Sequence, residues 1–165
     1  MAIVTVTYLQ MSSRDQLRPR DCPDPRFTVQ EATVKQWHYN RFLYVLVGTP
    51  WDWSDKLVWS DEDWKHYAER DTLRTFVAYY DGSPAGYFEL NFNVPGDVEI
   101  AYFGLAPKFI GKGFGGYLLT RALEIAWETK PARVWLHTCS KDHPAALANY
   151  QGRGLMIYKV EHIPV

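Results

Sequence analysis

The chain has 165 residues, which fits a single domain, and 47% of them are hydrophobic, enough for a sizeable core. Its formal net charge is -1 with no long run of like charge, which argues against nucleic acid as a partner, because nucleic-acid-binding proteins usually carry a basic excess. No stretch approaches the roughly eighteen consecutive apolar residues of a membrane span, so no membrane association is expected.

The cysteine content and the first residues indicate a cellular compartment. Cys22 and Cys139 are the two cysteines, and their wide separation suggests neither a disulfide framework nor a zinc cluster. The first ten residues lack the basic and apolar regions of a signal peptide. We therefore expect one cytoplasmic domain over residues 1–165.

The first half of the chain predicts one strand and two helices. In order, we expect a strand at 4–9, a loop at 12–26, a helix at 34–47, a tryptophan-rich loop at 49–59 and a helix at 61–70. Residues 27–30 could extend this loop at 12–26 or pair locally. Gly48 is a typical helix stop, and Ser60 is a typical N-cap because acidic residues follow it in the first turn.

The second half predicts strands, then helices and strands in alternation. In order, we expect strands at 72–80, 84–94 and 98–105, a helix at 114–127, a strand at 134–139, a helix at 144–152 and a strand at 156–162. Turn residues at 81–82 and 95–97 separate the first three strands, which therefore form an antiparallel meander. This order predicts an α/β or α+β fold, with helices on a mixed sheet.

A glycine-rich turn precedes the helix expected at 114–127. Residues 110–116 read Ile-Gly-Lys-Gly-Phe-Gly-Gly, and glycines let several backbone N–H groups point at one spot without interference from Cβ atoms. The N-terminus of the following helix adds its partial positive charge. The turn therefore predicts an anion site suited to a pyrophosphate.

The same turn has two alternative interpretations. Its Gly111-x-Gly113-x-x-Gly116 spacing satisfies the dinucleotide-binding fingerprint, which requires a strand running directly into the first glycine and an acid at the end of the next strand. Here residues 106–110 intervene and the strand expected at 134–139 carries no acid, so a nicotinamide site is disfavoured. A glycine turn that serves tight packing alone is the other alternative.

Two segments resemble the GNAT superfamily of acyl-CoA N-acyltransferases. Residues 98–127, VEIAYFGLAPKFIGKGFGGYLLTRALEIAW, are similar to the family's strand, proline-containing loop and Gln/Arg-x-x-Gly-x-Gly/Ala helix start, with Ile110 where the family often has Gln or Arg. Residues 132–158 are similar to its strand, helix and Tyr-x-x-x-Gly-Phe ending. Tyr150 and Gly154 match that ending, and Leu155 replaces the phenylalanine.

The resemblance implies a GNAT-like fold, a mixed and mainly antiparallel central sheet flanked by helices on both faces. It implies acetyl-CoA as acyl donor, no metal, and direct transfer in a ternary complex to a primary amine of a small molecule or peptide. The strand ending at Leu105 should splay from the strand at 134–139 to admit the pantetheine arm. The implied cofactor-binding residues are Phe103, Gly104, Leu105, Ile110, Gly111, Lys112, Gly113, Phe114, Gly115, Gly116 and His143.

The catalytic residues expected are an acid and a base, since the amine must lose a proton and the leaving thiolate must gain one. Tyr150 is the candidate acid by its match to the family motif. Glu99 is the candidate base, directly or through water, because a period of two places it on the face of Phe103 and Leu105. Glu89 is an alternative base.

Other side chains are weaker candidates. His137 is expected to be a packed sheet histidine, and a covalent relay through Cys139 would need a neighbour such as His143 to lower its pKa. No His, Asp or Glu cluster has the spacing of a metal site.

The acceptor and the partners are less defined by the sequence. We expect the amine to bind near Trp51 and Trp53, where Asp52 or Asp55 could attract a cation. An exposed edge of the sheet could pair with a second copy in a homodimer. A non-catalytic acyl-CoA-binding sensor or regulatory module is the alternative function, because it would keep the glycine turn and need no acid or base.

Overall fold

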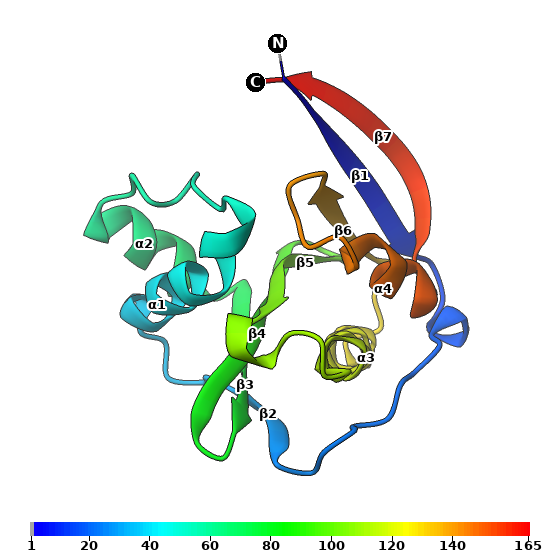
Figure 1. Ribbon diagram of the computed structural model, residues 1–165, viewed down its shortest axis with the longest axis horizontal. Coiled ribbons are helices and arrows are strands. Elements are labelled where there is room, and N and C mark those ends of the chain that lie inside the picture. Colours follow the sequence, from blue (N-terminus) through cyan, green and yellow to red (C-terminus); the bar gives the residue numbers. More distant parts are fainter. Residues whose placement is uncertain (1) are drawn as a thin grey trace.

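The computed structural model describes residues 2–165, which form one mixed sheet with helices on both of its faces (Figure 1). The sheet order is β2-β3-β4-β5-β6-β1-β7, and every neighbouring pair is antiparallel except β5 and β6. The strands are β1 (Ile3–Met11), β2 (Phe27–Glu31), β3 (Leu73–Tyr80), β4 (Ser83–Val94), β5 (Asp97–Leu105), β6 (Arg133–Cys139) and β7 (Met156–Pro164). The helices are α1 (Trp37–Gly48), α2 (Asp61–Ala68), α3 (Phe114–Glu128) and α4 (Ala146–Gly152). The predicted fold class is confirmed.

Three differences from the sequence-based expectation concern where an element forms or begins. Residues 27–31 form β2, which pairs along its whole length with β3. The sequence left open whether residues 27–30 extend the loop or pair locally. Helix α1 begins at Trp37, three residues later than expected, and Val34 before it is 78% exposed. Helix α4 begins at Ala146 after the exposed segment around Pro144.

The turns of the meander and the start of α2 follow the local chemistry of the sequence. Asp81 and Gly82 take positive φ values between β3 and β4, and Gly96 does the same between β4 and β5. At α2, the Ser60 side chain accepts from the Asp63 N–H at 3.2 Å while the Asp63 side chain accepts from the Ser60 N–H at 3.1 Å. This reciprocal cap satisfies two donors that a helix start leaves free.

The helices bury two different faces of the sheet. The larger core cluster joins α3 to β1, β4, β5 and β6, with Leu118, Leu119 and Leu123 fully buried on the helix side. A smaller cluster joins α1 to the opposite face through Leu43 and Val47. In Figure 1, α1 and α2 lie on one side of the β3–β4 hairpin and α3 on the other. Within residues 2–165 no helix is both long enough and apolar enough to cross a bilayer.

Strands β5 and β6 separate soon after they begin. Their parallel register covers only three pairs, from Asp97 with Arg133 to Glu99 with Trp135. Beyond these pairs β5 continues to Leu105 and β6 to Cys139 without pairing with each other. The expected splay is therefore present, and it leaves one edge of β5 unpaired in the middle of the sheet.

Candidate functional site

The glycine turn places uncapped backbone donors at the start of α3. Gly111 and Gly113 have φ values of +81° and +84°, a conformation that L side chains rarely adopt. Gly113 is the N-cap of α3 and offers no side-chain hydrogen bond to the helix. The first N–H groups of α3 therefore have no side-chain cap and can bind an anion.

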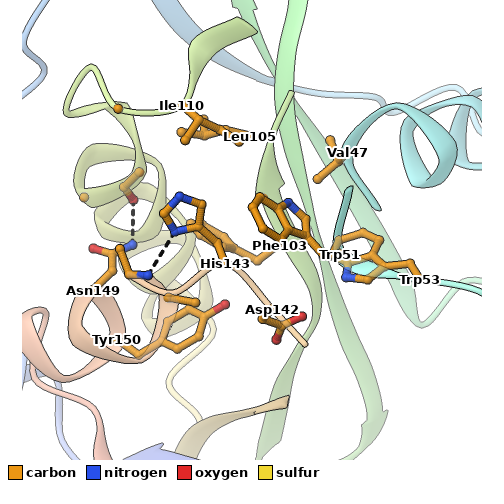
Figure 2. A pocket seen from close by; sticks show the side chains of 16 residues that line it. Val47, Trp51, Trp53, Phe103, Leu105, Ile110, Asp142, His143, Asn149 and Tyr150 are labelled. Carbon is orange, nitrogen blue, oxygen red and sulfur yellow. Dashed lines mark hydrogen bonds between the residues drawn. The ribbon is translucent and has the colours of Figure 1, made fainter. Parts of the chain in front are cut away.

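A cavity of about 280 Å³ lies between this turn, β5 and α4 (Figure 2). The predicted site residues that line it are Phe103, Gly104, Leu105, Ile110, Gly111, Gly115, Gly116, His143 and Tyr150. A Cβ at Gly111 would meet nothing within 4 Å, so the turn is open on that side. The backbone donors at the start of α3 give this cavity one end that suits a phosphate group.

Three of the predicted cofactor residues do not line this cavity. Phe114 is 4% exposed and stacks on Phe27 with ring centroids 4.4 Å apart, so its side chain belongs to the core. Lys112 lines a separate surface cavity beside Tyr80. Gly113 and Phe114 can contribute to the site only through their backbone, because helix period turns the Phe114 side chain towards the sheet.

A second cavity of about 390 Å³ occupies the gap between the diverging strands. Residues 100–103 of β5 and 136–139 of β6 line its two sides, and the tryptophan loop lines its mouth. Both cavities share the side chains of Trp51, Trp53, Phe103, Asp142 and Tyr150. These shared residues mark the junction of the two cavities.

Tyr150 lies at that junction on α4. Its side chain is 7% exposed, and its ring meets that of Phe103 edge-on at 6.0 Å. Figure 2 shows its hydroxyl directed towards Asp142. Burial raises the pKa of Tyr150, and the nearby Asp142 carboxylate raises it further. The hydroxyl therefore keeps its proton at neutral pH and can act as a donor.

Asp142 is a functional candidate that the sequence reasoning missed. One of its carboxylate oxygens accepts hydrogen bonds from the Thr138 hydroxyl and from the Cys139 N–H, the latter at 3.1 Å. These bonds fix the carboxylate at the end of β6 and leave its other oxygen without a recorded partner in residues 2–165. Its signal in the sequence is its position between the strand predicted at 134–139 and the helix predicted at 144–152.

Asn149 was also missed, although it lines the first cavity. Its side-chain amide donates to the Gly115 carbonyl at 3.1 Å and so joins α4 to the first turn of α3. His143, which was expected there, accepts from the Ala145 N–H at 2.9 Å and packs edge-on against Trp51. The wall of the cavity thus combines one anchored amide with an imidazole.

The structure contradicts the argument that placed Glu99 on the face of Phe103. The register of β5 against β4 shifts by one residue, since Leu90 pairs with Ile100 but Glu89 pairs with Tyr102. The bulge at Ala101 places Phe103 on the same face as Ile100, against the larger core cluster. Glu99 and Phe103 therefore point to opposite faces of the sheet, where a regular period of two would place them on one face.

The surroundings of Glu99 agree with this correction. Its carboxylate accepts from the Asn91 side chain at 3.0 Å, and the residue lines neither of the two cavities. The carboxylates that do line the second cavity are Asp52, Asp55 and Asp142. Asp52 is paired with Lys141 at 2.8 Å.

Glu89, the alternative base, is enclosed under α1 and α2. It is 1% exposed, and its two oxygens accept from Tyr67 at 2.5 Å and from Asn40 at 2.9 Å. Burial raises the pKa of its carboxyl group, while the hydrogen bonds from Tyr67 and Asn40 and the ammonium of Lys56 oppose that rise. Glu89 thus anchors two helices to the sheet and lines neither of the two cavities.

The remaining sequence candidates occupy less central positions. His137 is exposed and lines the second cavity, with its ring 5.6 Å from that of Tyr8 and 6.3 Å from that of Trp135. Cys139 lines the same cavity as a free thiol. Within residues 2–165 no group of three or more His, Cys, Asp or Glu side chains is arranged to hold a metal.

Comparison with known proteins gives one family match. The model of the acetyltransferase (GNAT) family matches residues 30–155, which is more than half of the chain. A search of curated proteins finds no significant match.

Solved structures with the same fold are distant in sequence. A GCN5-related N-acetyltransferase from Kribbella flavida has a TM-score of 0.68 at 15% identity, covering 96% of this chain and 56% of its own. A second from Sphaerobacter thermophilus has a TM-score of 0.70 at 14% identity, covering 96% and 50%. An aminoglycoside acetyltransferase from an uncultured soil metagenomic sample has a TM-score of 0.65 at 14% identity, covering 79% and 88%. At these identities the likeness shows the fold, and the chain spans only 50% to 56% of the first two structures.

Proposed function

The chain belongs to the GNAT acetyltransferase family, and from this membership we propose that it transfers an acetyl group from acetyl-CoA to a primary amine of a small molecule or peptide. The observation that carries the proposal is the junction of the two cavities at Tyr150 and Asp142. A donor site with an anion cradle at one end and an acceptor site at the other is what direct transfer in a ternary complex requires.

The donor would bind along the unpaired edge of β5. Because β6 departs after residue 99, the backbone groups from Ile100 to Leu105 on that edge have no strand partner. An extended pantetheine arm with amide groups can pair with such an edge as an added strand would. The N–H groups at the start of α3 would hold the pyrophosphate, and Ile110 would add apolar contact in place of a polar side chain.

Tyr150 and Asp142 would divide the proton transfers. We assign Tyr150 the acid role, because its raised pKa keeps the hydroxyl protonated for delivery to the departing thiolate. We assign Asp142 the base role in place of Glu99, because Asp142 reaches both cavities and one of its oxygens is held by β6. A water molecule could relay the proton from the amine to this carboxylate.

The acceptor would enter through the tryptophan loop. Trp51 and Trp53 line both cavities, and Tyr44 and Tyr102 extend the aromatic wall of the second cavity. Asp55 lines the same cavity and forms no ion pair in residues 2–165, so it can attract an ammonium group. This lining favours an amine attached to an aromatic or apolar group.

Release of CoA thiol from acetyl-CoA, followed with a panel of amines, tests the proposal. We expect amine-dependent release, a new amide in the product by mass spectrometry, and a loss of activity in Asp142→Asn that Glu99→Gln does not share. Tight acetyl-CoA binding without transfer to any amine would instead support the non-catalytic binding module. Tight binding of a nicotinamide nucleotide would refute the assignment of the glycine turn to CoA.

A further inference from the structure

Two arginines from distant segments meet at the first turn of α3. Arg20 lies in the loop between β1 and β2, and Arg153 directly follows α4. A Cβ added to Gly116 would lie 2.6 Å from Nη1 of Arg153 and 2.8 Å from Cδ of Arg20. Both side chains therefore cover the same glycine, and Gly116 also lines the first cavity.

This arginine pair has no neutralising partner in the described chain. Within residues 2–165 neither guanidinium forms an ion pair with a carboxylate. Nε of Arg153 is buried and makes no hydrogen bond. Burial lowers the pKa of Arg153, and the positive charge of Arg20 lowers it further. Because a buried charged donor without a partner costs free energy, this arrangement points to an anionic ligand.

The position of the pair identifies which anion suits it. The glycine turn at residues 111–113 and the uncapped start of α3 already provide backbone donors for a pyrophosphate. The arginine side chains converge on Gly116, three residues beyond the N-cap Gly113, and the backbone N–H of Arg20 donates to the Thr120 hydroxyl at 3.0 Å, which anchors the loop of Arg20 beside the helix. A second phosphate group of the same ligand would therefore face them. Paired guanidinium groups suit a phosphate monoester, which carries more charge and more free oxygens than a diester.

We propose that Arg20 and Arg153 bind the 3′-phosphate of the adenosine end of CoA and make the protein select CoA over 3′-dephospho-CoA. This inference rests on the proposed function, since it takes the acyl donor as the ligand of the first cavity. The arginine pair could not be predicted from the sequence, because residues 20, 116 and 153 come together only in the folded chain.

Calorimetric titration of the full chain with CoA and with 3′-dephospho-CoA tests the proposal. We expect the wild-type protein to bind CoA more tightly, and Arg20→Gln and Arg153→Gln each to lose roughly tenfold to a hundredfold in CoA affinity, as for a charge-assisted hydrogen bond. Their affinity for 3′-dephospho-CoA should stay unchanged. Arg41→Gln is the matched control, because Arg41 is an exposed arginine on α1.

Gly116→Ala provides a second variant that keeps both charges. Its methyl group would displace the flexible ends of the two arginines, so the preference for CoA should fall while the helix stays intact. Circular dichroism of every variant confirms that it is folded.

Two results would overturn the proposal. Equal wild-type affinity for CoA and 3′-dephospho-CoA would show that the 3′-phosphate is not bound. If the variants lose the same affinity for both ligands, the arginines bind the pyrophosphate instead. The experiment measures binding, so a preference for CoA that depends on the arginine pair supports the inference even if no amine is acetylated. Absence of acetylation would count against the proposed function alone. Failure of the wild type to bind either nucleotide would overturn both.

Discussion

Replacing Tyr150 with phenylalanine removes one hydroxyl at the junction of the two cavities. Within residues 2–165 that hydroxyl makes no hydrogen bond, so its loss should change the free energy of unfolding by less than about 1 kcal/mol. A positioned general acid contributes roughly a hundredfold to ten-thousandfold in rate, which is about 3–5 kcal/mol of transition-state stabilisation. We therefore expect kcat for thiol release to fall by that factor while acetyl-CoA binding is nearly unchanged.

The pH profile gives the same assignment a second test. Because burial and the Asp142 carboxylate raise the pKa of Tyr150 above its ordinary value of 10.0, the wild-type rate should show no loss from deprotonation of this acid between neutral pH and that value. Tyr158→Phe, which changes a tyrosine that is 40% exposed on β7, is the matched control and should be fully active. If Tyr150→Phe retains kcat within about twofold, Tyr150 is not the acid, because general acid catalysis is a larger effect.

Three further predictions concern the scaffold around the site. Gly86→Ala would place a Cβ 2.6 Å from the Gly104 carbonyl oxygen, a rigid contact, and should cost about 1–3 kcal/mol in thermal unfolding. Leu123→Ala should cost about 2–5 kcal/mol in urea unfolding by leaving a cavity under α3, and an unchanged midpoint would contradict that burial. Because the pKa of Glu89 is raised in the folded state, the folded protein keeps a proton that the unfolded chain releases, and the free energy of unfolding falls as the pH rises from about 4.5 towards the folded-state pKa. Glu89→Gln should reduce this pH dependence in unfolding curves taken at several pH values.

The parts of the fold that sequence predicted correctly depend on local chemistry. The start of α3 follows from Gly113, which takes positive φ as the N-cap, and the start of α2 follows from the reciprocal cap at Ser60. Strand β2 was under-predicted because its stability comes from pairing with β3, which lies more than forty residues later in the chain. Local propensity carries no information about such a distant partner.

The candidate site divides in the same way. Part of the first cavity could be outlined from the sequence, because residues 103–105, 110–111 and 115–116, which are close together along the chain, line it. The arginine pair could not, because Arg20 and Arg153 approach Gly116 from segments more than a hundred residues apart. The position of Asp142 between both cavities could not be predicted either, because it depends on hydrogen bonds from the end of β6 that form only in the folded chain.

The bulge in β5 explains why the period-two argument placed Glu99 on the wrong face of the sheet relative to Phe103. A period of two holds only while the pairing register is continuous, and here it shifts at Ala101, between Glu99 and Phe103. The same bulge lies on the wall of the second cavity, beside the edge that β6 leaves unpaired. The irregularity that removes Glu99 from the face of Phe103 is thus also part of the wall of the second cavity. Asp142, held at the end of β6, is a carboxylate that lines this cavity, whereas Glu99 on β5 does not line it.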